Sequence, residues 1–262
     1  RTYFHQAMQD QSDPPPVRRL LEVQEDQSLW RVFPAERALQ LFGEQKNVLV
    51  APSKWDDPFE NFLARCLVPI GNNQSASLAG LTSRFYGQCW CHSEAETDAT
   101  WRIYVPEKQR GIRIRVRAGT LFDTIYTPTD QSSAISCFLG KVEYMSELNL
   151  LSWLSNLNVQ QQLLIPDNVN IAKTLLVKRS QFSHENEVRL LYDLAAENCN
   201  ENKIMKFPCD PITLVQHVLL DPRWSEAEAQ LMERQLRCLG YHGPIEHSTL
   251  YSVPQFFNLQ PI

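Results

Sequence analysis

Residues 111–117 read G-I-R-I-R-V-R, an uninterrupted alternation of apolar and basic side chains. Successive side chains of a β-strand point to opposite faces, so Ile112, Ile114 and Val116 share one face and the arginines share the other. The stretch therefore predicts a strand with one face against the core. Further β-rich segments surround it, at 29–33, 48–51, 85–92, 138–144, 187–192, 203–207, 215–220 and 245–251.

Helical patterns are fewer. Pro34 suits the first turn of a helix over 34–43, and residues 98–105 form a second candidate. The S-E-A-E stretch at 225–228 is a capping box, and it opens a helix that ends at Gly240. Many strands with few helices predict an α+β fold, a single β-dominated domain of mixed sheets with a few flanking helices.

The first 28 residues differ from the rest of the chain. They are polar and contain three consecutive prolines at 14–16. We expect residues 1–28 to form an arm with at most one short helix over 17–23, which packs on a partner or on the main body. Residues 29–262 are expected to form one domain, because a core of that size is common in single domains.

Composition excludes several classes of protein. A chain that is 43% hydrophobic and 10% aromatic is not disordered. A net charge of −5 argues against a generally basic nucleic-acid coat, although 17 of its 25 cations are arginines. No apolar run is long enough to cross a membrane and no leader is visible, so we expect a cytoplasmic protein. The seven scattered cysteines are expected to be free thiols.

Motifs of the common enzyme classes are absent from the sequence. It has no glycine-rich phosphate loop, no H-E-x-x-H and no G-x-S-x-G. Its six histidines lie far apart, and we expect no metal site.

Three local clusters remain as candidates for chemistry. The first is W-D-D-P-F-E at 55–60, and the second is C-W-C-H-S at 89–93 with W-R-I-Y at 101–104. The third is H-E-N-E-V-R at 184–189. If it is extended, Glu185, Glu187 and Arg189 share a face, and the cation compensates the paired carboxylates. Each cluster also has a purely structural alternative. The first would be a rigid loop, the second would supply aromatics to the core, and the third would be a solvated strand face.

Taken in order, these clusters resemble a bacterial family catalogued as a domain of unknown function, number 2971. The matching segments are 29–33, 55–60, 90–93, 101–104 with Gly111, and 185–190, and the closing strand–helix–strand at 218–251 also fits. The resemblance covers about residues 29–253 and implies a fold and a set of motifs, but no activity. The chain departs from the family pattern at Asp56, at Cys91 and at Arg102-Ile103, where the family has Ser-His.

The same order also resembles ADP-ribosyltransferases of the Arg–Ser–Glu type. That resemblance implies that the protein binds NAD+ as its cofactor. It also implies a toxin or phage-defence effector that modifies nucleic acid or protein. It assigns catalytic roles to Glu187, with Glu185 as the second acid, and to Ser93 or Tyr104. A pyrophosphate would pair with Arg31 or Arg189, and Trp101 would stack on a base or on nicotinamide unless it belongs to the core.

Two other functions remain open. A non-catalytic binding module for nucleic acid or a partner protein would use the ladder Arg113, Arg115 and Arg117 to follow phosphates. A metal-dependent nuclease would use Asp56, Asp57, Glu60 and the late glutamates. The ADP-ribosyltransferase hypothesis requires that Arg31, Tyr104 and Glu187 meet in one cleft.

Overall fold

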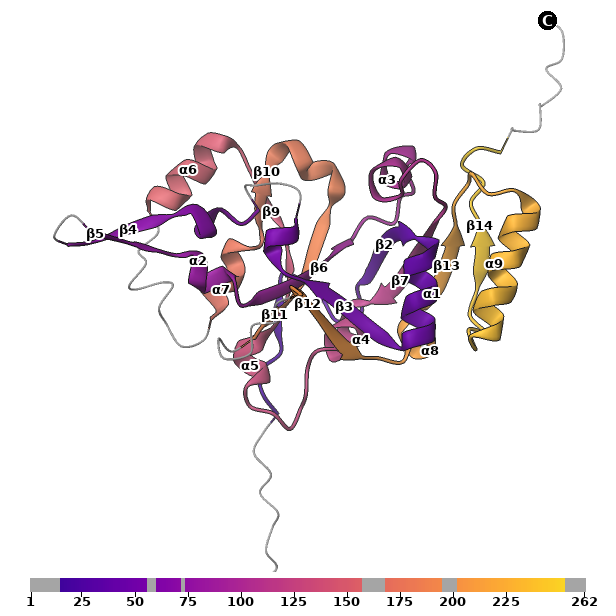
Figure 1. The fold of residues 1–262 in the computed structure, drawn as a ribbon, viewed down its shortest axis with the longest axis horizontal. Helices are drawn as coiled ribbons and strands as arrows, with labels where there is room; N and C mark the ends of the chain where they lie inside the picture. Colours follow the sequence, from indigo (N-terminus) through magenta and orange to yellow (C-terminus); the bar gives the residue numbers. More distant parts are fainter. Residues whose placement is uncertain (1–14, 56–59, 72–73, 157–167, 195–201, 253–262) are drawn as a thin grey trace, which may run out of the picture.

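The computed structural model describes residues 15–55, 60–71, 74–156, 168–194 and 202–252, and the chain is an α+β protein (Figure 1). Its strands are β1 (Arg19–Leu21), β2 (Ser28–Pro34), β3 (Lys46–Val50), β4 (Leu67–Gly71), β5 (Gln74–Ser77), β6 (Phe85–Cys91), β7 (Gly111–Arg117), β8 (Cys137–Lys141), β9 (Glu143–Met145), β10 (Val177–Arg179), β11 (Glu187–Asp193), β12 (Ile204–Pro208), β13 (His217–Leu220) and β14 (Ile245–His247).

The α-helices are short apart from the first and the last. They are α1 (Ala35–Glu44), α2 (Ala79–Thr82), α3 (Asp98–Tyr104), α4 (Ala118–Asp123), α5 (Ser133–Ser136), α6 (Glu147–Ser155), α7 (Val169–Thr174), α8 (Pro211–Leu214) and α9 (Glu226–Cys238). Three 3-10 turns, η1 (Pro52–Lys54), η2 (Phe62–Arg65) and η4 (Ser180–Glu185), complete the described elements. None of the helices in these ranges is long and apolar enough to cross a membrane.

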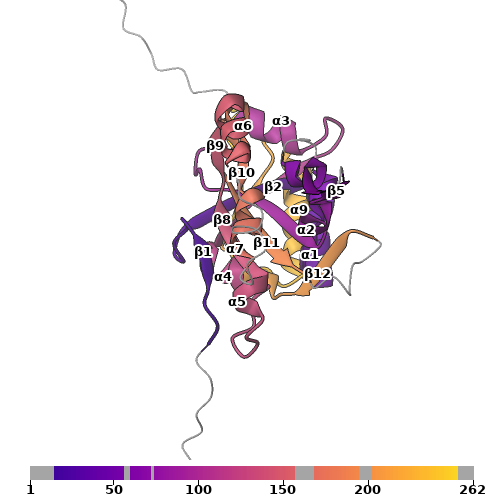
Figure 2. The same ribbon diagram turned by 90° about the vertical axis from the view of Figure 1, so that its left-hand side faces the viewer.

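One mixed sheet of ten strands organises the molecule. Its main path runs β1-β8-β11-β6-β2-β7-β13-β14, and β12 and β3 branch from it. Neighbours are antiparallel except at the two ends, where β1 pairs with β8 and β13 with β14 in parallel. The turned view in Figure 2 shows the helices distributed around this sheet.

The sheet opens in its middle, where β6 meets two strands at opposite ends. β2 pairs with β6 at Trp30 and Cys91, whereas β3 pairs with β6 at Val50 and Gly87. Because α1 joins β2 to β3, the three elements form a fork over β6. The edge of β6 between the two pairs is left uncovered by either strand, and this is where a cavity forms.

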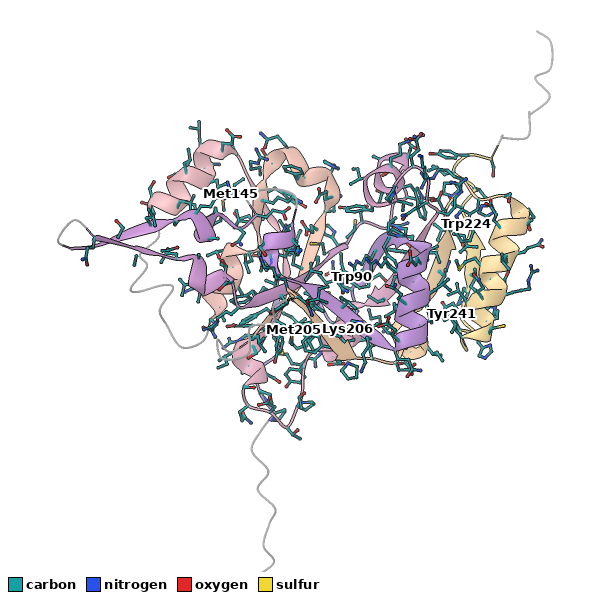
Figure 3. The ribbon with its side chains drawn as sticks, in the orientation of Figure 1. Trp90, Met145, Met205, Lys206, Trp224 and Tyr241 are labelled. Atoms are coloured by element: carbon teal, nitrogen blue, oxygen red, sulfur yellow. The ribbon has the colours of Figure 1, made fainter. Side chains whose placement is uncertain are left out.

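Three apolar clusters hold the sheet and helices together. The largest contains Ile112, Ile114 and Val116 of β7, all fully buried, together with residues of α1, α4, α8 and α9. In Figure 3, Trp224 and Tyr241 of this cluster lie beside α9, while Trp90 lies at the centre of the molecule. A second cluster packs α6 and α7 on the β8–β11 half of the sheet, and a third places α3 on the opposite face of β2 and β13.

Most of the expected elements are confirmed. The strand at 111–117 is β7, with its isoleucines buried as the alternation predicts. The capping box is present, since Ser225 and Glu228 bond reciprocally at the start of α9, and Gly240 follows that helix with a φ of +90°.

The prediction of a short helix over 17–23 is wrong, because this segment contains strand β1. β1 pairs with β8, and Val23 is buried in the largest cluster. The hydroxyl of Tyr126 donates to the carbonyl of Pro16, 2.6 Å away. Residues 15–27 are therefore packed on the sheet, while residues 1–14 lie outside the described part. The last strand is also shorter than expected and ends at His247.

Candidate active site

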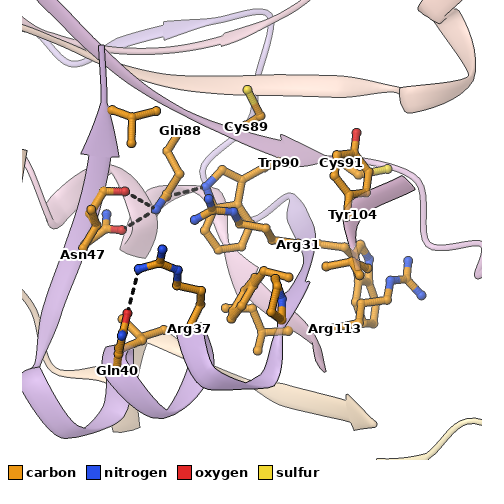
Figure 4. A pocket seen from close by; sticks show the side chains of 18 of the residues that line it. Arg31, Arg37, Gln40, Asn47, Gln88, Cys89, Trp90, Cys91, Tyr104 and Arg113 are labelled. Atoms are coloured by element: carbon orange, nitrogen blue, oxygen red, sulfur yellow. Dashed lines mark hydrogen bonds between the residues drawn. The ribbon is translucent and has the colours of Figure 1, made fainter. Parts of the chain in front are cut away.

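The cavity in the fork of the sheet has a volume of about 630 Å³. β6 forms its floor and β2 and β3 form two walls, and residues of α1, α3, β12 and β7, the last with Arg113 and Ile114, also line it. Its lining includes the unpaired edge of β6, namely Gln88, Cys89 and Trp90 (Figure 4). Enclosed volumes of about 300–1,000 Å³ are typical of small-molecule sites.

Carboxylates gather at one end of the cavity, where Glu185 and Glu187 line it together with Tyr104. The sequence analysis placed the two glutamates on one face of an extended segment, but they do not lie on one continuous strand. Glu185 ends η4, and Asn186 adopts a left-handed conformation with φ 45° before β11 begins at Glu187. The turn at Asn186 directs Glu185 to the side chain of Lys178, whereas Glu187 follows the strand alternation and shares a face with Arg189.

Glu187 is held on both of its oxygens. Arg189 Nε donates to Oε1 at 2.8 Å and Nη2 donates to Oε2 at 2.9 Å. Arg189 is 0% exposed, and its third nitrogen donates to the carbonyl of Leu175 at 2.6 Å. A planar guanidinium bound on two edges to one carboxylate is a rigid arrangement.

Lys178 connects three carboxylates. Its Nζ lies 2.5 Å from Glu185 Oε2, 2.6 Å from Glu60 Oε1 and 3.4 Å from Glu187 Oε2. Arg189 reaches Glu60 as well, at 3.2 Å. Three glutamates therefore share two cations, and the cluster carries one excess negative charge beside the cavity.

The pKa shifts follow from this arrangement. Burial alone would raise the pKa of Glu187, but Arg189 and Lys178 outweigh burial and hold it below its usual range. At Glu60 burial prevails over the same two cations and the pKa is raised. Burial, with Glu185 and Glu187 nearby, raises the pKa of the Tyr104 hydroxyl, so it stays protonated and can donate a hydrogen bond.

Arg31 occupies the wall formed by β2. Its guanidinium lies 5.4 Å from the ring centroid of Phe33 and 5.9 Å from that of Trp90. No carboxylate in the described ranges forms an ion pair with it, and burial lowers its pKa to about 10. A cation in a cavity without a compensating anion favours the binding of one.

A chain of hydrogen bonds fixes the floor between these groups. Trp90 Nε1 donates to Gln88 Oε1 at 2.7 Å, and Gln88 Nε2 donates to Asn47 Oδ1 at 2.7 Å (Figure 4). Asn47 Nδ2 in turn donates to Thr124 Oγ1 at 2.8 Å. Because each amide has its partners, the Trp90 ring that faces Arg31 is held in one orientation.

The opposite end of the cavity is basic. Arg37 of α1, Lys46 of β3 and Lys206 of β12 line it, with Glu44 as the carboxylate among them. Lys206 Nζ lies 2.7 Å from Glu44 Oε2. The cavity thus runs from a carboxylate end, past Arg31, to a cationic end.

The structure brings together four of the predicted catalytic and cofactor-binding residues: Arg31, Tyr104, Glu185 and Glu187 all line the cavity. Three others do not line it. Trp101 is fully buried in the third apolar cluster, where its Nε1 donates to Glu96 at 2.7 Å. Arg189 is occupied by glutamates, and Ser93 contributes its carbonyl to Arg113 at 3.0 Å.

The arginine ladder of β7 is not a uniformly exposed strip. Arg113 is 5% exposed, donates to the carbonyls of residues 93–95, and lies 4.1 Å from the Trp30 centroid. Arg115 is half-buried against the same ring, and Arg117 is exposed. β7 is an inner strand covered partly by α3 on this face, which is why the alternation did not reveal the burial of Arg113.

No group of three or more His, Cys, Asp or Glu residues that could hold a metal ion occurs among the described residues. Glu60 is committed to Lys178 and Arg189. Asp56 and Asp57, which the nuclease hypothesis also uses, lie outside the described residues.

Sequence reasoning missed Lys178, Gln88 and Asn47. Lys178 lies in a β-rich stretch and carried no motif, and it precedes the two glutamates by seven and nine residues. The amides gave no signal, because Gln88 contacts Asn47 and the carbonyl of Val48, which are 41 and 40 residues away in the chain.

No family model matches the chain, and no curated protein matches it. Three of the solved structures to which it is similar are of DarT from Thermus sp. 2.9. The complex with carba-NAD+ has a TM-score of 0.37 at 10% identity and covers 86% of this chain and 97% of that chain. The complex with NAD+ has a TM-score of 0.36 at 9% identity with the same coverage. The complex with ADP-ribosylated ssDNA has a TM-score of 0.37 at 8% identity and covers 86% and 96% of the two chains. At such low scores, we assign no activity from these similarities.

Proposed function

We propose that the chain is an ADP-ribosyltransferase-like enzyme that cleaves NAD+ in the fork cavity. The observation that carries the proposal is the convergence of Arg31, Tyr104 and the two glutamates on one cavity of about 630 Å³. In this reading Arg31 binds the pyrophosphate, because it lines the cavity beside Trp90 and forms no ion pair among the described residues.

The chemistry requires a carboxylate close to the ribose carbon that loses nicotinamide. Glu187 is only 3% exposed and has both oxygens engaged by Arg189 and Lys178. Glu185 uses Oε2 to contact Lys178 and has no described partner on Oε1. We therefore assign the catalytic role to Glu185, and a positioning role to Glu187 and Lys178.

The reaction breaks the C1′–N bond, and the electron pair leaves with neutral nicotinamide. Glu185 stabilises the positive charge that develops on the ribose and accepts the proton that the acceptor group loses when it bonds to C1′. Tyr104, whose pKa is raised, remains a neutral donor to a ribose hydroxyl or a carboxamide. Trp90 and Phe33 supply aromatic surface beside Arg31.

The test measures nicotinamide released from NAD+ by the wild-type chain, by Glu185→Gln and by Arg31→Gln, with a cell extract as the source of acceptor. Wild type should release nicotinamide. Glu185→Gln should lower the rate about 100-fold or more without changing NAD+ affinity strongly, since general-base and electrostatic contributions are of that size. Arg31→Gln should instead weaken NAD+ binding.

The matched control is Glu233→Gln, the same change in a partly exposed pair with Arg237 on α9, and neither residue lines the cavity. It should leave the rate unchanged. Absence of nicotinamide release by the wild type with every extract, or full activity of Glu185→Gln, contradicts the proposal.

A further inference from the structure

The cavity end opposite the glutamates carries more positive charge than a neutral nucleoside requires. Arg37, Lys46 and Lys206 line it against the single carboxylate of Glu44, so three cations face one anion. Lys206 is paired with Glu44 at 2.7 Å. Lys46 is half-buried and forms no ion pair within the described ranges, and Arg37 donates to the neutral amide of Gln40 at 3.0 Å.

Strand register places the two lysines on the same side. β3 and β12 are antiparallel, with Val48 opposite Lys206 and Lys46 opposite Pro208. Side chains alternate along a strand, so Lys46 and Val48 share a face, and Lys206 lies on that face diagonally from Lys46. Diagonal neighbours of an antiparallel pair are about 7–8 Å apart, close enough for two long side chains to hold one anion.

Apolar surface lies next to these cations. Leu41, Val48, Ile204 and Leu214 line the same end of the cavity. This combination of an apolar lining and three cations suits an aromatic base attached to a phosphate.

The orientation of the substrate follows from the proposed function, on which this inference rests. The ribose that loses nicotinamide must lie at Glu185, and the pyrophosphate at Arg31. The adenosine half then extends to the end lined by Arg37, Lys46 and Lys206. In NAD+ that half has only neutral hydroxyls on its ribose, whereas a phosphate monoester there carries about −1.5 to −2 charges at pH 7.

We propose that this basic end selects a dinucleotide with an additional phosphate on its adenosine ribose, and that NADP+ is therefore bound in preference to NAD+. Lys46 is the principal selecting residue, because it is half-buried and no described carboxylate compensates its charge, whereas Arg37 is exposed. Arg37 and Lys206 contribute, and Glu44 opposes them.

The experiment is isothermal titration calorimetry of the whole chain with NAD+ and with NADP+ in one buffer. We expect NADP+ to bind about tenfold or more tightly, as expected for one to two charge-assisted contacts. Lys46→Met should weaken NADP+ binding about fivefold and NAD+ binding less than twofold. Glu44→Gln, which frees Lys206, should strengthen NADP+ binding and leave NAD+ binding nearly unchanged.

Lys141→Met is the matched control. It removes the same charge from an exposed lysine at the end of β8 that does not line the cavity, and it should change neither affinity. If Lys46→Met fails to fold, Arg37→Gln on the exposed side of α1 gives the same comparison, with the same expected loss of preference.

Equal or tighter binding of NAD+ than of NADP+ overturns this inference and leaves the proposed function standing. The same holds if the preference survives in both Lys46→Met and Arg37→Gln. Failure of both dinucleotides to bind overturns the proposed function, and the inference falls with it.

Discussion

Glu187→Gln should destabilise the protein strongly, because it leaves a buried guanidinium without its main partner. Arg189 is 0% exposed and is held by two hydrogen bonds to Glu187, of 2.8 and 2.9 Å. Removing one member of a buried ion pair costs about 3–5 kcal/mol, since the remaining charge is desolvated without compensation.

Two features set the expected value at the low end of this range. Glu60 remains 3.2 Å from Arg189, and the carbonyl of Leu175 still accepts from Nη1 at 2.6 Å. Glutamine also keeps one acceptor oxygen in the same place. We therefore expect a loss of about 3 kcal/mol in the free energy of unfolding.

The assay is urea denaturation followed by tryptophan fluorescence and circular dichroism, with the slope m compared between variants. Glu233→Gln provides the control, because it makes the same chemical change in a partly exposed i,i+4 pair and should cost less than about 1 kcal/mol. If Glu187→Gln lies as close to wild type as Glu233→Gln does, Arg189 does not depend on Glu187 and the reasoning is refuted.

Further predictions concern pH, Arg31 and the thiols. The pKa of Glu187 is lowered in the folded chain, so its stabilisation is present above about pH 4.3 and is lost as the pH falls through the lower folded value. The difference in unfolding free energy between wild type and Glu187→Gln should therefore narrow at pH 3, and a constant difference would contradict this assignment. Arg31→Gln should leave the unfolding free energy within about 1 kcal/mol of wild type, or raise it, because no ion pair is lost; a large loss in urea denaturation would show that Arg31 is structural. Because burial lowers the pKa of Arg31 to about 10, its charge is present below that pH and lost above it. When ADP is titrated into both proteins between pH 7 and 10.5, the affinity of wild type should fall toward that of Arg31→Gln. A difference in affinity that stays constant with pH would refute the lowered pKa of Arg31. Iodoacetamide at pH 8 should modify the exposed Cys238 and spare Cys137, whose pKa burial raises to about 12; mass spectrometry that finds Cys137 modified in the folded chain would contradict its burial.

The strands with strong alternation could be predicted from the sequence, and so could the helices with caps. The pattern at 111–117 is local, and so is the S-E-A-E box, so both report structure without knowledge of the rest of the chain. The segment at 17–23 could not be predicted in the same way. Its strand exists because it pairs with β8, more than 100 residues later.

The candidate site could be predicted only in part. The resemblance to ADP-ribosyltransferases pointed to Arg31, Tyr104 and the two glutamates, and all of them line the cavity. Whether the other predicted residues can reach a ligand depends on their burial. Trp101 and Arg189 have the right chemistry for a ligand, but Trp101 is fully enclosed in an apolar cluster and Arg189 is bound to glutamates. The opening of the sheet at β6 comes from two single-residue pairings, which no sequence pattern encodes.

The measurement that tests the central claim most directly is a crystal structure of the chain with a non-hydrolysable NAD+ analogue. The account predicts the analogue in the fork cavity, with pyrophosphate oxygens within hydrogen-bond distance of the Arg31 guanidinium and the nicotinamide ribose beside Glu185. An analogue bound on another surface, or a cavity that stays empty at saturating concentration, would contradict it.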